Sequence, residues 1–203
     1  MSLKAIGTIA IPNAEGSEFD HAAFDPKSRC VFIAHTARDC VEVIDHDAGR
    51  HLATLPGFPG VAGAVADDGQ ILVTNRGSAS VALLNAGTLE TRATYKTGGR
   101  PNGAVIVARL GLGIAACIGV DGATLQLYGL SDHRHVSIDL PGRPRWCVTD
   151  AAAERIFPLH PRAFDGAGGA PAGARRGYPL EGPVGGRARS RHRPFQGPAL
   201  CRL

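Results

Sequence analysis

Residues 71–75, Ile-Leu-Val-Thr-Asn, and residues 81–85, Val-Ala-Leu-Leu-Asn, are two short apolar segments separated by the turn Arg-Gly-Ser-Ala-Ser. Segments of this kind, rich in β-branched residues and bounded by Gly, Ser and Asn, are typical of β-strands joined by a tight turn. Similar pairs occur about 40 residues earlier and again 43 to 44 residues later: 31–35 with 41–45, and 114–118 with 125–128. The sequence therefore contains an internal repeat, which has to be interpreted before any single motif.

Each pair is flanked by two further strand-like segments. A short apolar segment precedes each pair, at 22–24, 63–65 and 103–107, and a fourth copy stands at 147–148. Another segment follows each pair, at 51–55, 91–95 and 136–140. Four short strands recurring every 40 to 44 residues, without helical periodicity, predict an all-β fold built from four-stranded antiparallel propeller blades. A β-sandwich is the alternative, but its strands need not recur in groups of four.

The second repeat resembles a known family. Residues 71–85, followed by Thr-Leu-Glu-Thr at 88–91 and Gly-Gly-Arg-Pro-Asn-Gly at 98–103, resemble the YVTN-repeat (YncE-like) β-propellers. Repeats of that family run from a Tyr-Val-Thr-Asn strand to a Gly-x-x-Pro-His-Gly segment. The resemblance covers residues 3–157 and implies a seven-bladed propeller, of which this chain holds fewer than half the blades. It also implies that residues 4–11 form the outermost strand of a blade.

The repeat pattern stops at residue 157, inside the second strand of the fourth repeat. The segment 158–203 holds 9 Gly, 7 Pro and 8 Arg with no Lys, and it contains a single Val and no Ile. Such a composition cannot bury a core, so we expect a partial propeller over residues 1–157 and a disordered tail over 158–203. An Ala/Gly/Pro/Arg-rich segment in place of a strand is typical of a shifted reading frame in a G+C-rich gene. A genuine basic tail is the alternative.

Charge and cysteine content restrict the class of protein. The formal net charge of +4 comes from the tail, because residues 1–157 hold 16 acidic and 14 basic residues. With little aromatic interleaving in that tail, we do not expect nucleic acid as a partner. Five cysteines without a C-x-x-C pair indicate buried thiols rather than disulfides or a zinc site. No apolar run reaches 18 residues and no signal peptide is evident, so we expect a cytoplasmic protein without a membrane partner.

Candidate functional residues gather where a propeller usually binds ligands, at the mouth of its central channel. There the segments leading into the innermost strands meet the loops between second and third strands. The candidate ligand-binding residues are Asp20, His21, Asn75, Arg76, Asn102, Arg145 and Trp146. Arg76 and Arg145 are the expected contacts for an anionic ligand. Asp20 and Asn102 also suit turns that hydrogen-bond their own backbone, and His21 and His35 suit solvated loops.

These observations predict a non-enzymatic binding or scaffold protein that recognises a small molecule or a protein partner at the channel mouth, without a cofactor or a metal. The alternative is a metal-dependent lactonase-like hydrolase, in which Asp20 and Asn102 would supply two oxygen ligands. The frameshift hypothesis adds that the chain is inactive because it is truncated. No nucleotide-binding fingerprint or nucleophile motif is present in the sequence.

Overall fold

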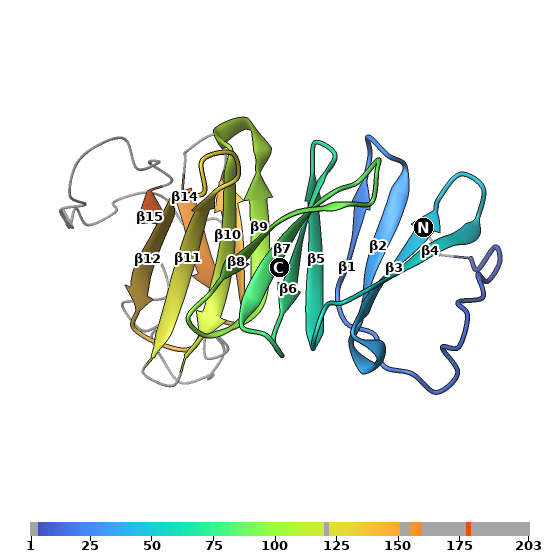
Figure 1. Cartoon of the computed structure of the whole chain (residues 1–203), viewed down its shortest axis with the longest axis horizontal. Coiled ribbons are helices and arrows are strands. Elements are labelled where there is room, and N and C mark those ends of the chain that lie inside the picture. The colour runs from blue at the N-terminus through green and yellow to red at the C-terminus, as the bar shows by residue number, and fades with distance from the viewer. Residues whose placement is uncertain (1–3, 120–121, 151–154, 160–177, 180–203) are drawn as a thin grey trace.

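The computed structural model describes residues 4–119, 122–150, 155–159 and 178–179. These residues form four antiparallel sheets, in each of which the strands follow chain order (Figure 1). The first blade comprises β1 (Ala22–Asp25), β2 (Cys30–His35), β3 (Cys40–Asp45) and β4 (Arg50–Pro56). The second comprises β5 (Val61–Asp67), β6 (Gln70–Asn75), β7 (Ser80–Asn85) and β8 (Thr91–Lys96). The third comprises β9 (Arg100–Val107), β10 (Leu112–Ile118), β11 (Ala123–Gly129) and β12 (His135–Leu140).

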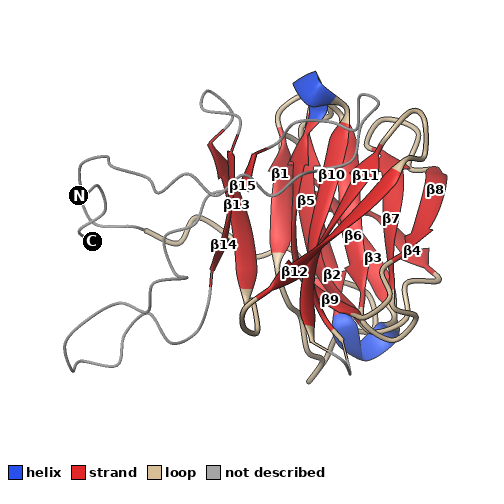
Figure 2. Cartoon of the chain, turned by 90° about the vertical axis from the view of Figure 1, so that its left-hand side faces the viewer, coloured by secondary structure: helices blue, strands red, loops and turns tan. Residues whose placement is uncertain are grey.

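A fourth sheet contains β13 (Trp146–Asp150), β14 (Arg155–Leu159) and β15 (Tyr178–Pro179), and Figure 2 shows it as a layer to one side of the other strands. β15 lies within the segment expected to be a disordered tail. The rest of that segment beyond Leu159 lies outside the described residues, so the boundary at 157 stays a prediction. Two short 3₁₀ helices, Thr36–Arg38 and Ala108–Leu110, complete the described structure, and neither is long and apolar enough to cross a membrane.

The blades pack face to face through apolar side chains. Phe32 and Val41 of the first blade pack with Ile71 of the second in one core cluster, and Leu72 packs with Tyr128 of the third in another. The innermost strands contact one another in order, β1 with β5, β5 with β9 and β9 with β13. This is the arrangement of consecutive propeller blades around an axis, as the repeat predicted.

The expected strand at residues 4–11 is wrong. These residues have no strand assignment, and Ile6 is 99% exposed. A strand needs a neighbouring edge to take its hydrogen bonds and a face against which to bury its apolar side chains. No described strand pairs with this segment, so it has neither.

The alignment of the third repeat was also wrong by one residue in its second strand. Matching Ile114 to Ile71 placed both on the same face, but Ile71 packs towards the first blade whereas Ile114 packs with Cys147 of the fourth sheet. The backbone register pairs Val73 with Ala64 and Ala115 with Ala104. Because side chains alternate along a strand, this one-residue difference changes the face to which every side chain of the strand is assigned.

Candidate functional site

The loops between second and third strands meet the segments leading into the innermost strands of the next blade. The amide of Gly60 donates to the carboxylate of Asp39 at 2.7 Å, and the amide of Arg76 donates to the carbonyl of Gly60 at 3.1 Å. At this end lies a cavity of about 600 Å³. It is lined by Asp20, His21, Arg76, Arg100, Asn102, Ile118, Arg143, Pro144 and Arg145.

Arg76 joins three blades at this cavity. Its Nη2 atom lies 3.3 Å from Asp20 Oδ2 in the segment leading into the first blade, and it donates to Asn102 Oδ1 of the third blade at 2.6 Å. The side-chain nitrogen of Asn102, Nδ2, in turn donates to the backbone carbonyl of Arg145 at 2.5 Å. Asp20 and Asn102 therefore bind neighbouring blades instead of capping their own turns.

The cavity is strongly cationic. Among the described residues, four arginines line it, Arg76, Arg100, Arg143 and Arg145, together with one carboxylate, that of Asp20. Guanidinium groups stay protonated at any physiological pH and present a rigid fork of donors. This mouth therefore carries a positive potential and suits a carboxylate or a phosphate.

Two of these arginines were not among the sequence candidates, although the repeat contains their signal. Arg100 precedes Pro101 in Gly-Gly-Arg-Pro, and Arg143 precedes Pro144 in Gly-Arg-Pro. The same Arg-Pro step thus opens the third and the fourth repeat. Comparing the repeats position by position would have placed both side chains at the mouth.

Of the predicted pair His21 and Trp146, His21 lines the mouth cavity and Trp146 does not, but the two side chains pack together. Their rings lie 4.3 Å apart between centroids at an interplanar angle of 33°. Both residues line a second cavity of about 330 Å³, bounded by the innermost strands of all four sheets. An ideal Cβ at Gly103 would lie 2.7 Å from Trp146, so the indole packs directly against the glycine backbone of β9.

Asn75 and His35 do not line the mouth. Asn75 is 3% exposed, and its amide donates to Ser80 Oγ at 3.4 Å within the second blade. The expectation that His35 is a solvated loop histidine is wrong, because His35 ends β2 with no exposed surface. A loop position was inferred from the turn that follows, whereas the antiparallel pairing with Cys40 places the imidazole inside the blade.

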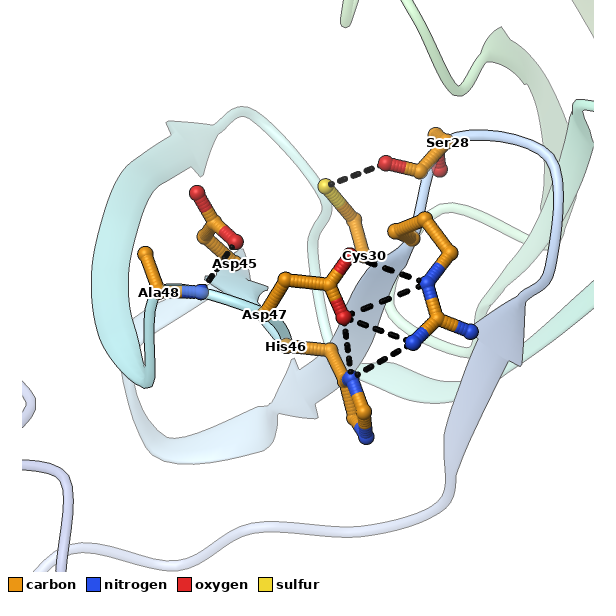
Figure 3. Close-up of polar contacts among 7 residues, drawn as sticks. Ser28, Cys30, Asp45, His46, Asp47 and Ala48 are labelled. Carbon is orange, nitrogen blue, oxygen red and sulfur yellow. Dashed lines mark hydrogen bonds and ion pairs between the residues drawn. The ribbon is translucent and has the colours of Figure 1, made fainter.

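An exposed ion-pair cluster occupies the opposite end of the first blade, at the turns that end β1 and β3 (Figure 3). Arg29 Nη2 lies 2.6 Å from Asp47 Oδ1, which also accepts from His46 Nδ1 at 2.9 Å. This pairing lowers the pKa of Asp47, chiefly through the hydrogen bond from Arg29. The cluster joins two turns of one blade and lies away from the mouth, so it has no place in the candidate site.

The described cysteines are free and buried, as the sequence predicted. They are Cys30, Cys40, Cys117 and Cys147, and Cys201 lies outside the described residues. Burial raises the pKa of the Cys117 and Cys147 thiols to about 12. Both therefore stay protonated at physiological pH and are poor nucleophiles.

The solved structures that resemble this chain include β-propeller-like proteins. Hydrazine synthase of Kuenenia stuttgartiensis superposes with a TM-score of 0.65 at 18% identity, over 77% of this chain and 45% of that one. A chain of the nidogen/laminin complex gives 0.60 at 16% identity, over 70% and 57%. Streptogramin B lyase gives 0.56 at 14% identity, over 71% and 52%. This chain thus spans about half the length of these proteins. No protein-family model matches the chain, and no curated protein does.

Proposed function

We propose that this chain is the binding part of a YVTN-like β-propeller and takes a small anionic molecule, a carboxylate or a phosphate, at the channel mouth without transforming it. The observation that carries the proposal is the convergence of four arginines from three repeats on one cavity, in which Asp20 is the single carboxylate among the described lining residues. Arg76 comes from the second repeat, Arg100 from the third, and the other two from the fourth. Bringing several guanidinium groups together in one cavity costs electrostatic repulsion, which a bound anion would relieve.

The size and depth of the mouth fit a small ligand. A cavity of about 600 Å³ lies within the range usual for small-molecule sites, roughly 300 to 1,000 Å³. The Arg76 side chain is 29% exposed and fixed by Asp20 and Asn102, whereas Arg100 and Arg145 are exposed at the rim. Arg76 thus shapes the site, and the rim arginines are the groups that we assign to the ligand. A guanidinium bound to a carboxylate or a phosphate forms two parallel hydrogen bonds, which gives orientation as well as affinity.

The same contacts favour anion binding over the lactonase-like alternative. The two candidate metal ligands, Asp20 Oδ2 and Asn102 Oδ1, both face Nη2 of Arg76, at 3.3 Å and 2.6 Å. A divalent cation placed between these oxygens would lie beside a guanidinium and would have to displace it. Streptogramin B lyase, one of the similar structures, is named as an enzyme, but its likeness at 14% identity concerns the fold.

Isothermal titration calorimetry with citrate and inorganic phosphate tests the proposal, with glucose as the neutral comparison. We expect saturable binding of an anion and none of glucose. Arg145→Gln should weaken anion binding about tenfold or more, because a hydrogen bond to a charged group contributes about 1.5–3 kcal/mol. Arg92→Gln, an exposed arginine on β8 outside the cavity, is the matched control and should bind like wild type. Equal loss in both variants, or no binding of either anion, would overturn the proposal.

A further inference from the structure

The first blade contains a buried polar cluster that the channel mouth does not use. His35 and Glu42 have no exposed surface, and Cys40 is 2% exposed. His35 Nδ1 lies 2.7 Å from Glu42 Oε1, and Cys40 Sγ lies 3.4 Å from the same oxygen. One nitrogen, one sulfur and one carboxylate oxygen thus lie within 4.8 Å of one another in the interior.

Strand register brings the three groups to one face. His35 ends β2 and pairs with Cys40, the first residue of β3, and Glu42 follows two residues along β3 on the same side. Val41 and Val43 point to the other side, into the core shared with the second blade. The cluster therefore lies on the face of the first blade that is turned away from its neighbour.

In the third blade, the positions that correspond to His35, Cys40 and Glu42 hold neutral side chains. There Cys117 pairs with Thr124, and Gln126 follows two residues along the strand. Gln126 Nε2 donates to Thr124 Oγ1 at 2.7 Å and to Ser137 Oγ at 2.8 Å. The blade can thus satisfy this interior with an amide and hydroxyls. The first blade instead buries a carboxylate beside an imidazole and a thiol, and burying a charge costs free energy unless it is compensated.

We propose that His35, Cys40 and Glu42 bind a Zn²⁺ ion through Nδ1, Sγ and Oε1. Imidazole, thiolate and carboxylate are the donors that zinc takes in proteins, at about 2.0–2.3 Å each. Donors around a tetrahedral ion at such distances are separated by roughly 3.3–3.8 Å. The three atoms already lie within 4.8 Å of one another, so shifts of about an ångström suffice to accommodate the ion.

Neighbouring side chains orient two of the three proposed ligands, Glu42 and His35. The free carboxylate oxygen of Glu42, Oε2, accepts from His51 Nε2 at 2.8 Å and from Thr54 Oγ1 at 2.6 Å, which leaves Oε1 for the metal. Ser17 Oγ lies 2.6 Å from His35 Nε2, and the ring of Phe19 stacks on the imidazole at 4.2 Å. Metal-bound histidines usually donate their second ring nitrogen to such a partner. A serine hydroxyl can accept that hydrogen bond as well as donate one.

Zinc binding by this cluster must release protons. Without metal, the Cys40 thiol donates a hydrogen bond to Glu42 Oε1, so it carries its proton. Coordination replaces that proton with the metal, and the imidazole ligates with its hydrogen on Nε2. Affinity for Zn²⁺ should therefore rise with pH, as it does whenever a ligand has to lose a proton.

Titration of the metal-free full-length protein with Co²⁺ and Zn²⁺ tests the site. Tetrahedral cobalt with a thiolate ligand gives a sulfur-to-metal charge-transfer band, and we expect this band to saturate at one ion per chain and to disappear on addition of Zn²⁺. Cys40→Thr copies the third blade at this position, so it should fold and lose the band. Cys30→Ser, a buried thiol of the same blade bonded to the carbonyl of Ser28, is the matched control and should keep it.

Affinity for Zn²⁺ gives a second measurement. Glu42→Gln also copies the third blade, and loss of this ligand should weaken Zn²⁺ binding about 100-fold or more, whereas Ser17→Ala should weaken it about 10- to 100-fold. If a variant fails to fold, X-ray absorption of the zinc-loaded wild type decides: one sulfur at about 2.3 Å supports the site. A zinc shell of nitrogen and oxygen alone, or a charge-transfer band that persists in Cys40→Thr, would overturn the proposal.

Discussion

The carboxylate of Asp25, at the end of β1, accepts a hydrogen bond from the backbone amide of Gly69 in the second blade at 3.1 Å. Its other oxygen accepts from the amide of Ser28 at 2.8 Å. The equivalent residue of the second blade, Asp67, accepts from the amide of Ala108 in the third at 2.8 Å. A carboxylate at the end of an innermost strand thus fixes a turn of the next blade, in two successive repeats.

Asp25→Ala should therefore destabilise the first two blades. Asp25 has no exposed surface, so its removal leaves the amides of Gly69 and Ser28 without their acceptor. Loss of hydrogen bonds to a buried charge costs about 1.5–3 kcal/mol, and we expect a decrease of that size in the free energy of unfolding. Urea denaturation followed by circular dichroism measures it. Asp68→Asn, which removes an exposed charge paired with Lys27 at 3.2 Å but keeps a residue type suited to the positive φ of this turn position, is the control and should leave the midpoint unchanged.

Stability should fall in acid, and Asp25 and Glu42 should contribute to the fall. Burial alone would raise the pKa of Asp25 above 3.8, but hydrogen bonds from Ser28 and Gly69 outweigh it and lower that pKa. The pKa of Glu42 is likewise below 4.5, because hydrogen bonds from Thr54, His35 and His51 outweigh its burial. A carboxylate with a lowered folded-state pKa stabilises the fold above its unfolded pKa and loses that contribution as pH falls through the folded value.

We thus expect a constant melting temperature from pH 7 to about 5 as far as these two groups decide it, and a decrease below about pH 4. Asp25→Asn should melt lower than wild type at pH 7, and the difference should shrink as the pH is lowered. A difference that stays constant over this range would contradict the assignment.

Arg76 and Arg145 should respond differently to the same substitution. Arg76→Gln removes the cation held between Asp20 and Asn102, so it should lower the melting temperature and also weaken anion binding. The guanidinium of Arg145 is exposed at the rim, whereas its backbone is held: its carbonyl accepts from Asn102 Nδ2, and its amide donates to the carbonyl of Leu159 at 2.7 Å. Arg145→Gln should therefore weaken binding while leaving the melting temperature in ligand-free buffer unchanged. Equal melting temperatures for the two variants would contradict the structural role of Arg76.

The sequence was sufficient for the strands of the blades, apart from the strand expected at residues 4–11 and the one-residue shift in the third repeat, but not for the sites that the strands assemble. The blades could be predicted from a period of about 40 residues, because each repeat contains strand-like apolar segments and the turn residues that separate them. The observed β6 and β7 lie within one residue of their expected bounds. The cluster around Glu42 has no such signal. His35, Cys40 and Glu42 come together through strand register, and Ser17 reaches them from a segment that has no strand assignment. Such a contact belongs to no repeating pattern.

The partners of Asp20 were missed for a similar reason. A turn residue was expected to bond its own backbone, as Asn85 does with the amides of Gly87 and Thr88. Asp20 instead bonds Arg76, which lies a whole blade further along the chain. Which of the two outcomes applies depends on how the blades are placed, and this is decided by packing between repeats rather than by local propensity.

Gly103→Ala should loosen the packing of Trp146 against β9. The added Cβ would lie 2.7 Å from both the Cα and the Cε3 atoms of Trp146, closer than carbon atoms tolerate, so β9 and β13 must move apart. Overpacking of this kind costs about 1–3 kcal/mol. Trp146 is the single tryptophan of the chain, so its fluorescence reports the change directly, and we expect red-shifted emission and a lower unfolding midpoint. Gly7→Ala, at a glycine with nothing within 4 Å of the added carbon, is the matched control. If both variants keep the wild-type emission and midpoint, the close approach of Trp146 to β9 is wrong.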